Sequence, residues 1–86
     1  MRAFRVAVTD TPQLVVEVDD VPRPVWVQIL GNTTVYLGAS DVSSTTGFPI
    51  VKHSAPIEGG LPPGESLYCV TASGETETLC VILQDA

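Results

Sequence analysis

The chain has 86 residues, of which 44% are hydrophobic and 16% charged, and it carries a net charge of −6 with only four lysines and arginines. Nucleic-acid binding needs basic side chains that neutralise phosphates, so this charge argues against a DNA- or RNA-binding protein. No run approaches the roughly 20 apolar residues that cross a membrane, and the N-terminus lacks the apolar core of a signal peptide. We therefore expect no membrane partner and synthesis in a cytoplasm.

The composition is rich in apolar side chains for one small domain. A domain of this size buries only about 60–65% of the surface that its unfolded chain exposes. Some apolar side chains should therefore stay at the surface, where they usually mark an interface.

The first half of the chain alternates apolar residues with others, which is the pattern of half-buried strands. Residues 3–8 place Phe4, Val6 and Val8 on one face, and residues 13–18 repeat the pattern with Leu14, Val16 and Val18. The strongest strand is 25–30, where Val25, Val27 and Ile29 oppose Trp26, Gln28 and Leu30. Gly31-Asn32 tolerates positive φ, so we expect a hairpin over 25–38.

The middle of the chain indicates loops. Residues 39–46 are rich in Ser and Thr, whose hydroxyls can bond to nearby backbone groups. The short apolar piece 48–51 follows. Prolines and glycines between 56 and 64 then allow only an irregular connection or short edge strands.

The last part predicts a second hairpin, from 66–72 and 76–83, through a turn at Gly74-Glu75. This register would set Tyr68 opposite Val81 and Cys69 opposite Cys80. A cross-strand disulfide is then conceivable, but a reducing compartment favours two buried free thiols, and two cysteines suit neither a disulfide scaffold nor a zinc site.

These elements predict an all-β fold, a small antiparallel β-sandwich or barrel of about six to seven short strands in one domain over residues 1–86. Exposed sheet edges in so small a body need cover. We expect a homo-oligomer, with a trimer favoured, in which the N-terminal strands of 1–20 engage a neighbouring subunit and 25–86 form the main sandwich.

No catalytic, cofactor or metal site emerges from the sequence, so we expect no enzyme. The single histidine, His53, sits in a Pro-rich stretch without a partnered nucleophile. Glu75 and Glu77 are expected to be solvated at a turn. The prolines of residues 59–64 rule out a phosphate-binding loop there.

Aromatic side chains are the leading binding candidates, because they bury much area at low entropic cost. Tyr68 is expected in the core, whereas Trp26 and Tyr36 share faces with polar residues. The interface candidates are Phe4, Trp26, Tyr36, Phe48 and Ile50.

Four segments resemble small virion proteins of tailed bacteriophages, especially those of actinobacteria. They are TVYLG at 34–38, DV at 41–42, TGFPI at 46–50 and LPPGESLY at 61–68. The resemblance covers about residues 25–83 and consists of turn and packing signatures.

The resemblance implies a capsid decoration or minor capsid protein on the exterior of the virion, whose partners are the major capsid protein and its own copies. Two alternatives stay open. One is a tail or fibre-tip component that binds host glycans through Trp26, Tyr36 and the Ser/Thr loop. The other is a head–tail connector.

Overall fold

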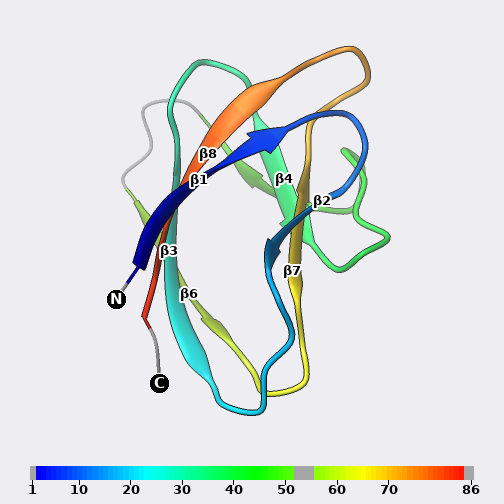
Figure 1. Cartoon of the computed structure of the whole chain (residues 1–86). Coiled ribbons are helices and arrows are strands. Elements are labelled where there is room, and N and C mark those ends of the chain that lie inside the picture. Colours follow the sequence, from blue (N-terminus) through cyan, green and yellow to red (C-terminus); the bar gives the residue numbers. More distant parts are fainter. Residues whose placement is uncertain (1, 52–55, 85–86) are drawn as a thin grey trace.

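The computed structural model describes residues 2–51 and 56–84, and these residues contain eight strands and no helix. The strands form two four-stranded antiparallel sheets that face each other (Figure 1). We call β1-β8-β3-β6 the first sheet and β2-β7-β4-β5 the second sheet. The strands are β1 (Arg2–Val8), β2 (Gln13–Val16), β3 (Arg23–Ile29), β4 (Val35–Gly38), β5 (Phe48–Ile50), β6 (Ile57–Leu61), β7 (Leu67–Val70) and β8 (Glu77–Leu83). The all-β class expected from the sequence is confirmed. Of the two predicted architectures, sandwich or barrel, the structure is a sandwich, and its described residues form eight strands where six to seven were expected.

The chain changes sheets at nearly every connection. Among the described strands, only β4 and β5 are both consecutive and paired. The hairpin predicted over 25–38 is wrong, because β3 lies in the first sheet and β4 in the second. The hairpin predicted for the last two strands is wrong for the same reason, since β7 pairs with β2 and β4, while β8 pairs with β1 and β3.

The core lies between the sheets. In the first sheet, inward rows run across the strands, such as Phe4, Val81, Val27 and Ile57. Val35, Ile50 and Cys69 of the second sheet meet them and are fully buried. The predicted division of β1 and β3 into two faces is therefore confirmed, and the structure turns the faces of Phe4 and Val27 inward.

The predicted alternation in β2 is wrong. A register irregularity between Leu14 and Val16 turns both Val15 and Val16 into the core, and it leaves Leu14 and Val18 exposed. A bulge adds a residue on one strand and so breaks the period of two. Tyr68, expected in the core, stands opposite Leu14 and Gly38 and is only half-buried.

The N-terminal strands belong to the chain's own sandwich. β1 pairs with β8 along its whole length, from Arg2 opposite Leu83 to Val8 opposite Glu77. The main sandwich therefore starts at residue 2 and not at residue 25. One edge of β1 stays outermost in the first sheet.

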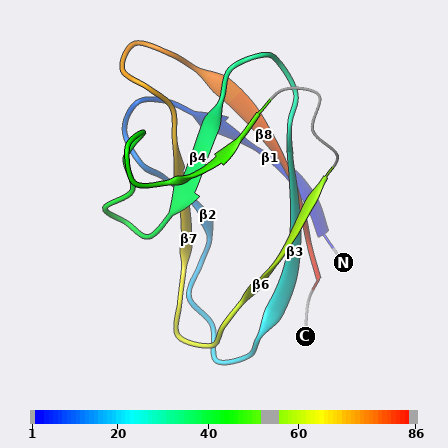
Figure 2. The same ribbon diagram turned by 180° about the vertical axis from the view of Figure 1, so that it is seen from behind.

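The loop between β4 and β5 folds over the outer face of the second sheet (Figure 2). Its hydroxyls bond to its own backbone as expected: the Ser43 amide donates to Thr46 Oγ1 at 3.2 Å, and the Thr45 amide donates to Ser43 Oγ at 3.3 Å. Val42 is buried, as is Val70 on β7. A Cβ at Gly38 would stand 2.9 Å from the Cγ2 of Val42, so the loop packs closely on β4.

Candidate binding surface

The outer face of the first sheet is the leading candidate for a binding surface. Because side chains alternate along a strand, the row that faces outward across four strands is Ala3, Ile82, Trp26 and Glu58. A second outward row joins Arg5, Cys80 and Gln28. Four separate parts of the sequence thus build one surface.

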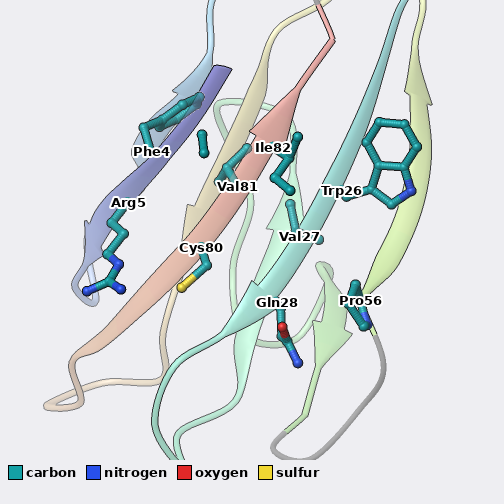
Figure 3. Close-up of a pocket in the computed structure, with 10 residues that line it drawn as sticks. Phe4, Arg5, Trp26, Val27, Gln28, Pro56, Cys80, Val81 and Ile82 are labelled. Atoms are coloured by element: carbon teal, nitrogen blue, oxygen red, sulfur yellow. The ribbon is translucent and has the colours of Figure 1, made fainter. Parts of the chain in front are cut away.

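This face is hollowed. A shallow depression of about 400 Å³ lies over β1, β8 and β3, and Figure 3 shows its side chains. It is lined by Ala3, Phe4, Arg5, Trp26, Val27, Gln28, Pro56, Cys80, Val81 and Ile82. We call this depression the Trp26 hollow.

The centre of the Trp26 hollow is apolar. Ile82 is 40% exposed and stands directly opposite Trp26, which is half-buried. Cross-strand pairs of an aromatic and a β-branched residue stabilise a sheet. Here both side chains of the pair are on the outer face of the sheet, so the pair also offers an apolar surface to a partner. On the second sheet, by contrast, Val70, the outward neighbour of Tyr36, is buried.

The charges lie at the two ends of this face. Arg5 is exposed on the edge strand β1, and Glu58 is exposed on the opposite edge strand β6. An apolar centre with charges at its rim is the usual anatomy of a protein interface.

The two cysteines are free and lie in different sheets. The predicted Cys69–Cys80 register is therefore wrong, because Cys69 stands opposite Gln13 and Leu37. Cys69 is fully buried, and burial raises the pKa of its thiol to about 11. Cys80 is only half-buried and lies in the Trp26 hollow.

The five predicted interface residues do not gather in one place. Trp26 lies in the hollow, and Phe4 borders it while packing inward against the core. Tyr36 points to the outer side of the second sheet, beneath the β4–β5 loop. Phe48 is 59% exposed on the edge strand β5, whereas Ile50 is fully buried and offers no surface to a partner.

Sequence reasoning missed that Ile82, Cys80 and Arg5 line the same hollow as Trp26. The signal for Ile82 is the run Val81-Ile82-Leu83, because three consecutive apolar residues on one strand must place the middle one on the opposite face. Arg5 and Cys80 could not be found, since their position depends on which strands pair.

The solvated role expected for Glu77 is wrong. Its carboxylate accepts hydrogen bonds from the backbone amides of Gly31 at 2.9 Å, Thr33 at 2.7 Å and Thr78 at 2.8 Å. Burial acts to raise the pKa of Glu77, but these three bonds outweigh it and hold the pKa below its ordinary value. Glu77 thus links the β3–β4 connection to β8 through hydrogen bonds. Glu75 is exposed, as expected.

Arg23 plays a similar role at the other end of the sandwich. Its side chain is buried, donates to the Glu17 carbonyl oxygen and lies 3.9 Å from the Asp19 carboxylate. These contacts fix the connection between β2 and β3.

Residues 2–51 and 56–84 contain no group of three or more metal-ligating side chains and no helix long and apolar enough to span a membrane. His53 lies outside these described residues. No protein family, curated protein or solved structure matches the chain.

Proposed function

We propose that this protein is a structural, non-enzymatic component of a bacteriophage virion, which decorates the outer surface of the head by binding the major capsid protein. The Trp26 hollow carries this proposal as the contact surface. It joins a tryptophan and an exposed isoleucine on a face that the described part of the chain leaves uncovered. Tryptophan is enriched among the residues that dominate binding energies.

The net charge of −6 fits a position on the outside of the shell, away from packaged DNA. A ligand that binds only the assembled shell stabilises it by linkage, by about 2.7 kcal/mol per site at a hundredfold excess over its dissociation constant. Self-association, with a trimer favoured, would make weak single contacts avid.

The glycan-binding alternative is less well supported. It needs Trp26 and Tyr36 on one surface, but their side chains lie on the outer faces of opposite sheets. The Ser/Thr loop lies with Tyr36 and not with Trp26.

The proposal is tested by measuring how many copies of the protein bind to purified shells when residues of the Trp26 hollow are substituted. Trp26→Ala and Ile82→Thr should each lower occupancy at least about tenfold, as expected for central interface residues. Leu30→Thr is the matched control, because Leu30 directly follows the same strand, is 57% exposed and does not line the hollow. Occupancy equal to that of wild type for both hollow variants, measured on folded protein, would overturn the assignment of the hollow.

A further inference from the structure

The two lateral sides of the sandwich differ in charge and both expose apolar side chains. One side is formed by the edge strands β1 and β2, and the other by the edge strands β5 and β6. We propose that the β1–β2 side of one copy docks on the β5–β6 side of another copy, with β1 pairing antiparallel to β6 of the neighbour. This inference rests on the self-association in the proposed function and names the surfaces that would associate. It does not depend on binding to the capsid.

Strand direction allows this pairing without rearrangement. All pairs in the first sheet are antiparallel, so its two edge strands, β1 and β6, run in opposite directions. When a second copy is placed beside the first in the same orientation, its β6 runs antiparallel to β1. The first sheet then continues from one copy into the next.

The charges on the two edges are complementary. β1 carries Arg2 and Arg5, both exposed, and has no acidic residue. β6 carries Glu58, also exposed, and has no basic residue. Glu17 and Asp19 lie near the β1 edge as well, but they belong to the β2–β3 connection, where Asp19 pairs with Arg23.

One register satisfies both faces of the continued sheet. Arg5 and Glu58 both point outward, so they can stand opposite each other. This pairing sets Phe4 opposite Gly59 of the neighbour and uses all five residues of β6. A Cβ at Gly59 would have open space around it, so the Phe4 ring can cover this glycine, an arrangement that stabilises glycine in sheets.

The register also suits the backbone. Along a strand, the amide and carbonyl of successive residues point alternately to the two neighbouring strands. The row Phe4, Val81, Val27 and Ile57 fixes this alternation across the sheet. In the register with Arg5 opposite Glu58, each β1 residue whose amide and carbonyl point to the free edge therefore stands opposite a β6 residue whose groups also point to its free edge. The two edges can then form backbone hydrogen bonds.

The second sheet adds apolar area to the same contact. Leu14 is 44% exposed and Val18 62% exposed beside β1, and both border a groove that Phe4 also lines. On the other side, Phe48 and Ile57 border an apolar opening that reaches Val25 and Leu37 of the core. Docking of like copies would cover both openings at once.

Such a contact joins two different surfaces, so it produces either a closed ring or an open filament. A two-fold dimer through β1 alone would instead place side by side two strands that carry Arg2 and Arg5 and no acidic residue. The charge pattern therefore favours the head-to-tail arrangement.

Charge reversal tests the proposal by sedimentation of the full chain at low salt. Arg5→Glu and Glu58→Arg should each raise the dissociation constant of self-association about tenfold, and the double variant should restore it, because the reversed pair is again complementary. Glu75→Arg is the control, with the same charge change as Glu58→Arg at an exposed turn. A monomeric wild type, or a double variant no better than the single ones, would overturn the proposal.

Oxidative cross-linking tests the register. Cys80 stands directly opposite Arg5 in the same chain, so the variants are built on Cys80→Ser to prevent an internal disulfide. A chain with Arg5→Cys and a chain with Glu58→Cys should form a disulfide dimer when mixed and little when oxidised separately. Dimers of equal yield from either chain alone, or none on mixing, would contradict the register. Sedimentation and cross-linking both use the isolated protein, so their results do not depend on whether Trp26→Ala loses binding to shells.

Discussion

Gly47 lies directly against Tyr36. A Cβ at position 47 would stand 2.6 Å from the Cβ of Tyr36 and 2.7 Å from the Cγ2 of Val42. A Cβ at Gly38 would stand 2.9 Å from the same Val42 methyl. The glycines of the TVYLG and TGFPI segments therefore allow the β4–β5 loop to pack on the second sheet.

Gly47→Ala should lower the free energy of unfolding by about 1–3 kcal/mol, because the added methyl group overpacks the contact with Tyr36 and Val42. Urea denaturation measures this change. Gly60→Ala is the control, since a Cβ there has nothing within 4 Å. Equal stabilities of the two variants would show that the loop does not pack as described.

Only one of the two cysteines should react in the native protein. Cys80 is half-buried on the outer face of the first sheet, whereas Cys69 is fully buried and its pKa is raised to about 11 by burial. Since the thiolate is the reactive species, a maleimide should modify Cys80 rapidly and Cys69 only after unfolding. Mass spectrometry of the native and denatured protein measures this, and rapid double modification of the folded chain would contradict the packing of Cys69.

Modification of Cys80 should also interfere with binding. Because Cys80 lies in the Trp26 hollow, a bulky thiol adduct occupies the proposed contact surface. Protection of Cys80 from maleimide by bound shells, compared with free protein, is the expected observation. An unchanged rate of modification in the bound state would place the contact elsewhere.

Glu77 predicts a pH-dependent contribution to stability. Its pKa is lowered in the folded chain by backbone hydrogen bonds from Thr78, Thr33 and Gly31, which together outweigh the effect of burial. A lowered folded pKa stabilises the fold above the unfolded pKa, near 4.3, and this stabilisation is lost as the pH falls through the folded value. Glu77→Gln should therefore destabilise the protein by about 1–3 kcal/mol at neutral pH.

The difference between wild type and Glu77→Gln should shrink as the pH falls below about 4, where the carboxylate of the unfolded chain is protonated. Thermal or urea denaturation across this pH range measures it. Glu75→Gln, at the exposed turn before β8, should show little change at any pH. A Glu77→Gln effect that is independent of pH would contradict the ionised role of this side chain.

The faces of β1 and β3 were predictable from the sequence, but the faces of β2 and the strand partners were not. The alternation over residues 25–29 correctly set Val25, Val27 and Ile29 on one face, and the structure buries that face. Gly31-Asn32 and Gly74, however, permit both a hairpin and a connection that crosses to the other sheet. Glu77 and the pairing of β8 with β1 and β3 decide between them, and these contacts join residues far apart in the chain.

The same limit applies to the candidate site. Trp26 was predicted because it shares a strand face with Gln28, which is local information. Ile82 and Arg5 join it only through the order of strands in the first sheet. Ile50, predicted to lie at an interface, is in the core, because β5 pairs with β4 and sets Ile50 opposite the fully buried Val35.

Binding to a partner should change the fluorescence of Trp26. It is the single tryptophan of the chain and lies half-buried at an uncovered face. Removal of water from the indole by a docked surface shifts its emission to shorter wavelength, so shells added to the protein should produce a blue shift that saturates. Shells without tryptophan, or difference spectra, separate the Trp26 emission from that of the shell. Saturable binding without a shift in this emission would exclude Trp26 from the contact.

The copy number of this protein in purified virions tests the central proposal most directly, by quantitative mass spectrometry against the major capsid protein. We predict a number comparable to that of the major capsid protein, as expected for a protein that decorates the whole shell. A handful of copies would contradict shell decoration and place the protein in the tail or connector, and absence from the particle would contradict a virion role altogether.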